Sequence, residues 1–209
     1  MVDRLSDVLA AAARGEFPPV DGVIEVTGPP AGLDLEAVVE FTGHAIVATA
    51  LPSEVVLSRQ YDAFGGIVSA DALRWLAGPS GEVGCLDVVL VTSGTGRSTL
   101  PLRGDLDEHP RVIAARRRRN DVIVYGDDTG LVTVGIGLGN RWEVSVELFD
   151  ETARSGGAGR RLIGEAIGHV PDGEPVFASV APGNAASLRS FLATGFEPIG
   201  AEVIIHPGR

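Results

Sequence analysis

The chain has 209 residues, of which 44% are hydrophobic and 22% charged, and this composition is typical of a globular protein rather than a disordered one. Its formal net charge of −11 argues against general nucleic-acid binding, which needs a basic surface. No apolar run approaches the roughly 18 residues of a membrane-spanning helix, so no membrane partner is expected and a cytoplasmic location is predicted.

Individual residue types exclude further classes of protein. All 17 basic residues are arginine, which suits a GC-rich bacterial genome and leaves no lysine for a Walker-type phosphate loop. Cys85 is the single cysteine, so no internal disulfide can form; its apolar surroundings predict a buried thiol. The four histidines are scattered without metal-ligand spacing, and no metal site is expected.

The first part of the chain has the pattern of a mixed α/β unit. Apolar periodicity predicts helices over 1–16, 33–43 and 69–78, and strands over 22–28, 44–50 and 85–91. The Gly/Ser/Thr-rich stretch over 92–99 has the composition of a linker. We therefore expect one domain over 1–95, of unknown role, and a second over 96–209.

The second part alternates strands and helices in a different order. The pattern predicts, in turn, a short strand 99–103, a helix 105–119, strands 121–127, 130–138 and 141–149, a helix 160–170, a strand 174–181, a helix 184–195 and a strand 201–206. Asp-Asp-Thr-Gly over 127–130 is a hairpin signal. The expected fold class is α/β of the α+β kind, a mixed and mostly antiparallel sheet flanked by helices, with the additional N-terminal α/β unit.

Glycines and arginines crowd the segment between the strand 141–149 and the helix that follows. The first turn of a helix has unpaired N–H groups and a partial positive charge, and glycines allow an anion to approach them closely. This pattern indicates a phosphate cradle; a plain glycine turn is the alternative. The residues concerned are Arg154, Ser155, Gly156, Gly157, Ala158, Gly159 and Arg160.

Two motifs in this half resemble the GNAT superfamily of N-acetyltransferases. Arg154-x-x-Gly157-x-Gly159 is similar to the superfamily signature that holds the pyrophosphate of acetyl-CoA. The stretch from Asn184-x-x-Ser187 to Gly195-Phe196 looks like its CoA-flanking helix. The resemblance covers about residues 99–206 and implies a GNAT-like fold, with acetyl-CoA as co-substrate and a small-molecule or peptide amine as acceptor; homodimer formation stays open.

The resemblance also implies roles for particular residues. The pantetheine arm is expected along the strand that precedes the signature, and the strand 174–181 is expected to splay away from it. A backbone N–H of Leu148 or Phe149 would polarise the thioester carbonyl. Asn184 would steady the arm, with N-capping of its own helix as the alternative, and Ser187 belongs to the same motif.

Acylation of an amine also needs a base, because an alkylammonium with a pKa near 10 is not a nucleophile at neutral pH. Glu143 and Glu147 lie four residues apart on one strand and therefore share a face. We expect this face to supply the base and favour Glu147; a solvated strand face is the alternative.

One position departs from the family pattern. Phe191 stands where the superfamily often has a tyrosine that protonates the departing thiolate. Phenylalanine has no proton to donate, so water would have to serve. Two functions follow: an acyl-CoA-dependent N-acyltransferase, which the motifs favour, or a non-catalytic CoA-binding or structural protein that lost the general acid.

Overall fold

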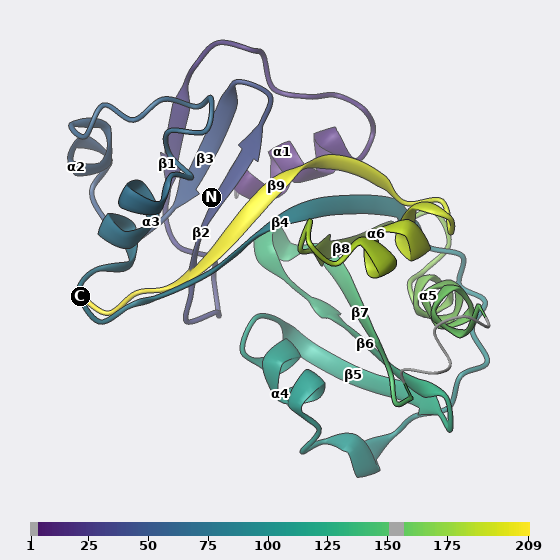
Figure 1. The fold of residues 1–209 in the computed structure, drawn as a ribbon. Coiled ribbons are helices and arrows are strands. Elements are labelled where there is room, and N and C mark those ends of the chain that lie inside the picture. The colour runs from purple at the N-terminus through teal and green to yellow at the C-terminus, as the bar shows by residue number, and fades with distance from the viewer. Residues whose placement is uncertain (1–3, 151–156) are drawn as a thin grey trace. The chain divides into compact units, whose positions relative to one another are not determined.

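The computed structural model describes residues 4–150 and 157–209, which form two compact units (Figure 1). Unit 1 consists of Met1–Val89 and Ile199–Arg209, and unit 2 of Leu90–Pro198. The described strands are of mixed direction and mostly antiparallel and are flanked by six α-helices, which confirms the expected fold class. None of the helices in these ranges is long and apolar enough to span a bilayer.

Unit 1 is a sheet with the strand order β1-β3-β2-β9-β4. Its elements are α1 (Arg4–Ala12), β1 (Ile24–Thr27), β2 (Glu36–Phe41), β3 (His44–Ala48), α2 (Ser53–Leu57), α3 (Ala70–Ala77), β4 (Glu82–Ser93, shared with unit 2) and β9 (Glu197–His206, which enters at Ile199). β1 runs parallel to β3, whereas β3 and β9 both pair antiparallel with β2.

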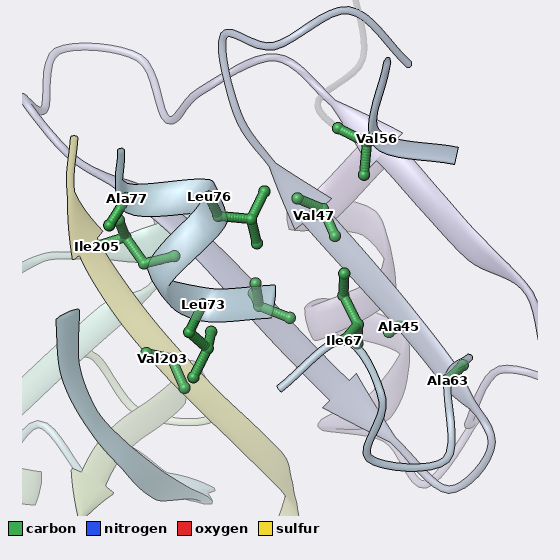
Figure 2. Packing of buried hydrophobic residues seen from close by; sticks show 11 residues of the cluster. Ala45, Val47, Val56, Ala63, Ile67, Leu73, Leu76, Ala77, Val203 and Ile205 are labelled. Carbon is green, nitrogen blue, oxygen red and sulfur yellow. The ribbon is translucent and has the colours of Figure 1, made fainter. Parts of the chain in front are cut away.

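The core of unit 1 lies between this sheet and the short helices α2 and α3 (Figure 2). Val47 of β3 and Val203 and Ile205 of β9 meet Leu73 and Leu76 of α3, all of them buried. Because the last strand of the chain supplies part of this core, unit 1 is discontinuous in sequence. The domain boundary expected at residue 95 stays a prediction. The two compact units of the structure divide instead between Val89 and Leu90 and between Pro198 and Ile199.

The predicted helix over 33–43 is wrong, because Glu36–Phe41 forms the strand β2. Neighbours pair with β2 on both edges, and five of its six residues are buried. A strand covered on both faces loses the alternation that marks a half-exposed one, so its apolar run resembles a helix. The short helix α2 was missed for its lack of a long periodic pattern.

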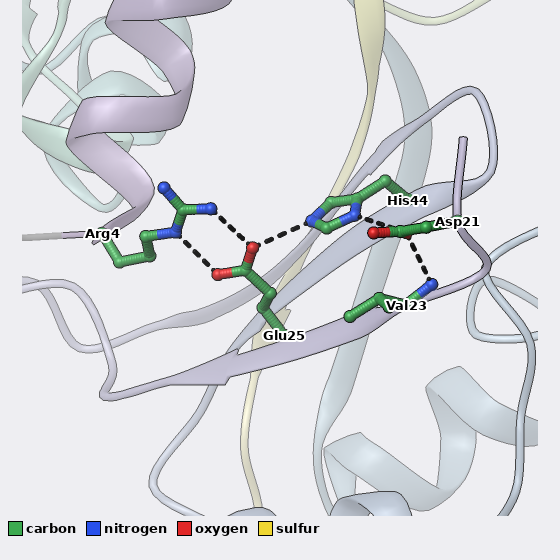
Figure 3. Close-up of polar contacts among 5 residues, drawn as sticks. All are labelled: Arg4, Asp21, Val23, Glu25 and His44. Carbon is green, nitrogen blue, oxygen red and sulfur yellow. Dashed lines mark hydrogen bonds and ion pairs between the residues drawn. The ribbon is translucent and has the colours of Figure 1, made fainter. Parts of the chain in front are cut away.

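Charged residues tie the first helix and the chain end into unit 1. Arg4 of α1 donates from Nε and Nη2 to Glu25 at 2.7 and 2.6 Å, and buried His44 lies between Glu25 and Asp21, at 3.1 and 3.0 Å (Figure 3). Arg209 contacts the buried carboxylate of Glu36. His44 therefore bridges the carboxylates of Asp21 and Glu25 through its two ring nitrogens.

Unit 2 has the strand order β4-β8-β7-β6-β5. After the end of β4 come α4 (Pro110–Arg116), β5 (Asn120–Asp127), β6 (Gly130–Ile136), β7 (Trp142–Leu148), α5 (Ala158–Gly168), β8 (Pro175–Val180) and α6 (Ala185–Leu192), which confirms the predicted order. The short strand expected over 99–103 is reduced to one bridge, between Leu102 and Tyr125.

Helices cover the two faces of β5, β6 and β7. Val112 of α4 packs on Val124 and Leu131, on the face that also carries Glu147, the register partner of Leu131. Leu162 of α5 approaches Gly130, which faces the other way because side chains alternate along a strand. α4 and α5 therefore lie on opposite faces, and the acidic residues of β7 are on the α4 side.

Candidate functional site

β7 and β8 separate soon after they begin. They pair in parallel only at Trp142 with Val176 and Glu143 with Phe177, although β7 continues to Leu148 and β8 to Val180. The pairing therefore ends within the stretch where the motif resemblance predicts that the two strands separate. Beyond this point, the backbone groups of β7 that face β8 have no ladder partner within the β7–β8 pairing of the described strands.

The hydrogen bonds on the other edge of β7 show which groups face the opening. The Phe149 N–H donates to the Thr129 carbonyl at 3.1 Å, and the Gly137 N–H donates to Arg141 at 2.9 Å. Hydrogen-bonded residues alternate along an antiparallel pair. The backbone N–H and C=O groups of the odd-numbered residues of β7 therefore point toward β6, and those of the even-numbered residues point toward β8. Of the two expected oxyanion donors, Phe149 is therefore already engaged. The Leu148 N–H faces the opening, with that of Val146 one step earlier.

α5 begins beside the end of β7. Gly157 is its N-cap, with a left-handed φ of 81° that favours glycine, and Ala158 is its first residue. A Cβ on Gly159 would lie 3.9 Å from the Leu148 side chain and 4.0 Å from Ser190 of α6. The first-turn N–H groups therefore emerge near the β7–β8 opening. Arg154, Ser155 and Gly156, the other members of the expected cradle, lie outside the described residues.

The two arginines of the first turn of α5 differ in their contacts. Arg160 is exposed, and its Nη2 would lie 3.7 Å from a Cβ on Gly157. Arg161 instead pairs with Asp127 at 2.6 Å, at the hairpin between β5 and β6. Arg160 is thus the described arginine best placed beside the start of the helix.

α6 carries the second motif. In it Asn184 has the alternative role given above, that of N-cap of its own helix. The Asn184 side chain accepts the Ser187 N–H at 3.2 Å and so caps its own helix. Both residues lie at the exposed start of α6. Phe191 is only 3% exposed and meets the ring of Phe196 edge-on, at 4.9 Å between centroids. Its surroundings are those of a packing residue.

Glu143 is buried between two guanidinium groups. Arg119 donates to it at 2.7 Å and Arg141 at 3.1 Å, and the three side chains are 9% exposed or less. Burial raises the pKa of Glu143, but the two arginines outweigh it and hold that pKa below its usual range. A carboxylate so stabilised in its charged form is a poor proton acceptor.

Glu147 lies in a more open setting on the same face. Its Oε2 accepts a hydrogen bond from Nε of Arg111 at 2.7 Å, and the two side chains are 36% and 44% exposed. Arg111 is the second residue of α4, and its N–H is capped by Nδ1 of His109. The His109 ring lies 5.9 Å from the ring of Phe149. An exposed acid, a cation and an aromatic ring therefore meet at the end of β7.

The predicted linker over 92–99 is wrong. Thr92 and Ser93 belong to β4, and the N–H groups of Thr95 and Gly96 donate to Ile167 and Val170 at the end of α5. Farther along, the Ser98 hydroxyl lies 2.7 Å from Glu165 and 2.8 Å from Nε2 of His169, and His169 stacks on Tyr125 at 3.4 Å. This segment, 94–99, is a strap that fixes α5; small polar residues gave no sign of these long-range partners.

Cys85 also differs from its prediction, since its side chain is exposed on β4. Of the four arginines 116–119 at the end of α4, Arg116 pairs with Asp107. Arg119 has the further contact with Glu143, which no local pattern could reveal.

No protein-family model matches the chain, and no curated protein matches it significantly. Among solved structures, the chain is similar to a candidate acetyltransferase of the GNAT family from Novosphingobium aromaticivorans, with 18% identity, a TM-score of 0.43, and coverage of 63% of this chain and 69% of that one. It is also similar to a conserved protein of unknown function from Staphylococcus epidermidis, with 13% identity, a TM-score of 0.39, and coverage of 60% and 62%.

Over part of its length, the chain therefore resembles a GNAT-family protein in structure, in line with the sequence motifs.

Proposed function

We propose that the chain is an acyl-CoA-dependent N-acyltransferase that moves an acetyl group from acetyl-CoA to an amine. The observation that carries the proposal is the end of the β7–β8 register after Glu143 and Phe177, next to the glycine-capped start of α5. An extended amide chain can pair with backbone groups at such an opening, and a pyrophosphate suits the helix N-terminus beside it.

The residues of unit 2 divide the binding of acetyl-CoA between them. The N–H groups at Ala158 and Gly159, with the exposed Arg160, would hold the pyrophosphate. Val146 and Leu148 would pair with the amides of the pantetheine arm, because their backbone groups face the opening. Asn184 and Ser187 would lie along the arm, although the Asn184 oxygen already caps α6.

In the reaction, Glu147 accepts a proton from the ammonium group of the acceptor. The neutral amine attacks the thioester carbonyl, and the Leu148 N–H stabilises the oxyanion that forms. The C–N bond is made, the C–S bond breaks, and the second proton of the amine passes through water to the departing thiolate. The products are an amide and CoA, with one proton released to solvent. Glu143 has no part in this step, because its charge is held by two buried arginines.

A second candidate, a non-catalytic CoA-binding protein, is favoured by Phe191. The ring has no hydroxyl and is buried against Phe196, so α6 supplies no general acid at this position. A thiolate whose parent thiol has a pKa of about 8.5 can take its proton from water. The absence of a general acid on α6 therefore slows the reaction without forbidding it.

Two measurements on the intact protein test the proposal. Acetyl-CoA at about 100 times its dissociation constant should raise the free energy of unfolding by about 2.7 kcal/mol. A panel of amines should then release free thiol from acetyl-CoA in the presence of the protein. Binding without release by any amine supports the non-catalytic candidate, and an unchanged melting temperature at millimolar acetyl-CoA contradicts both.

A further inference from the structure

The ion pair between Arg111 and Glu147 leaves hydrogen-bonding atoms of both side chains available to a ligand. The hydrogen bond joins Nε of Arg111 to Oε2 of Glu147. Within the part of the chain that the structure describes, neither Oε1 of Glu147 nor the two Nη nitrogens of Arg111 make a hydrogen bond or ion pair with another residue. At 36% and 44% exposure, both side chains can be reached by a small molecule.

Arginine presents its donors as a rigid, planar fork that matches the two oxygens of a carboxylate. The backbone of Arg111 is fixed because His109 caps the start of α4 and accepts the Arg111 N–H at 3.2 Å. The fork therefore stands at a defined place beside Glu147. Packing of α4 on the sheet through Val112, which is fully buried, holds it there.

A simple alkylammonium is a poor match for this site. It would approach Glu147 beside the permanent positive charge of Arg111, which repels the ammonium. An acceptor that carries its own carboxylate next to the amino group compensates for the guanidinium. Its two charges can meet the two halves of the ion pair without breaking the bond between them.

We propose that the acceptor is a small zwitterion of the α-amino-acid type, with its carboxylate on the Nη fork of Arg111 and its amino group at Glu147. This inference rests on the proposed N-acyltransferase function and names the substrate class of the same site. The ring of Phe149, 41% exposed and on the same face, adds an apolar surface beside the pair for the side chain of such an acceptor.

Matched acceptors test the proposal on the full-length protein. Leucine and 3-methylbutylamine differ only by the carboxylate, as do phenylalanine and phenethylamine. The wild-type chain should acetylate each amino acid with a higher kcat/KM than its decarboxylated partner. Arg111→Gln should lower kcat/KM for the amino acids about 10-fold to 100-fold, the range of a hydrogen-bonded charge pair. It should not lower kcat/KM for the amines, because it removes the charge that repels them.

Two further variants make the result specific. Arg111→Lys keeps the charge but loses the fork, so it should recover only part of the preference. Arg118→Gln removes an exposed arginine from the end of the same helical segment and should change neither value. Acetyl-CoA affinity, measured for every variant, should stay at the wild-type value and shows that each protein is folded.

The outcomes separate the two proposals. If amines are acetylated and Arg111→Gln leaves the ratio of amino acid to amine unchanged, the zwitterion proposal is wrong and the ion pair is an ordinary surface contact. If neither kind of acceptor is acetylated while acetyl-CoA binds, the N-acyltransferase function fails and the substrate class falls with it.

Discussion

Glu143 and Glu147 share one face of β7, and their neighbours give them different properties. Glu143 lies among buried arginines, whereas Glu147 has one exposed partner and stands two residues from Phe149 at the end of the strand. Sequence spacing puts both on one face but cannot distinguish them. The distinction comes from Arg111 of α4, from Arg119 just after that helix and from Arg141, the residue before β7.

Glu147→Gln tests the proposed base. The amide keeps the shape of the side chain and loses proton acceptance, so turnover should fall by roughly 10² to 10⁴, the usual contribution of a general base. The deficit should shrink at higher pH, where more of the amine is neutral. Steady-state kinetics against pH, with acetyl-CoA binding measured in parallel, check this; equal turnover in both proteins would place the base elsewhere.

At the scale of elements, α5 is held at both ends by different means. Its start is a glycine cap beside β7, and its end is fixed by the strap over 94–99 through Glu165 and His169. The strap also packs closely on Gly168, where a Cβ would lie 2.8 Å from the Ser98 nitrogen. The position of the proposed pyrophosphate site therefore depends on contacts more than two turns away.

Gly157→Val tests the cap. Valine disfavours the left-handed φ of 81° and puts a side chain beside the first-turn N–H groups, so acetyl-CoA affinity should fall at least tenfold. Gly173→Val is the matched control, because Gly173 has a φ of 82°, open space around it and no place in the proposed site. Similar affinities in the two variants, both folded by circular dichroism, would return Gly157 to the role of a plain turn.

The lowered pKa of His169 predicts how the stability of the contact between the strap and α5 depends on pH. Burial lowers its pKa below the unfolded value of about 6.5, and Glu165 opposes this only in part. The unfolded chain therefore binds the proton more readily than the folded chain. The contribution of neutral His169 to the free energy of unfolding is fully present above about pH 6.5, and it declines as pH falls through the folded pKa. Thermal unfolding between pH 7.5 and about 5 should show a smaller pH-dependent loss for His169→Gln than for the wild type; parallel curves would contradict this.

At the scale of the whole molecule, the chain returns to unit 1 after it completes unit 2. β9 lies between β2 and β4, and Val203 and Ile205 are at most 1% exposed in the core. Arg209, the last residue described, contacts the buried Glu36. Unit 1 therefore cannot complete its sheet from the first 95 residues alone.

Fragments test this directly. Residues 1–95 should fail to unfold cooperatively, because the fragment lacks β9 and exposes an apolar face. Residues 1–89 joined through a short Gly/Ser loop to 199–209 should recover a cooperative transition, since Gly84 and Gly81 lie against Ile204 and Gly208 in the folded chain. Thermal unfolding followed by circular dichroism compares them; cooperative unfolding of residues 1–95 would restore the sequence-based boundary.

The sequence by itself determined the local features of this protein. Helical periodicity defined α5, alternation placed Glu143 and Glu147 on one face of β7, and the glycines marked the start of a helix after a strand. These features depend on neighbours a few residues away, so backbone geometry and residue preferences suffice to predict them. The motif resemblance added the expectation that β7 and β8 separate.

Only the tertiary structure decided which residues meet. β2 is a strand because β3 and β9 pair with it on both edges, and the final strand belongs to unit 1 because its buried face completes that core. Arg111 and Arg119 select different glutamates of one strand for the same kind of reason. Such contacts join segments far apart in sequence, and their energies depend on burial and distance, which a local pattern does not contain.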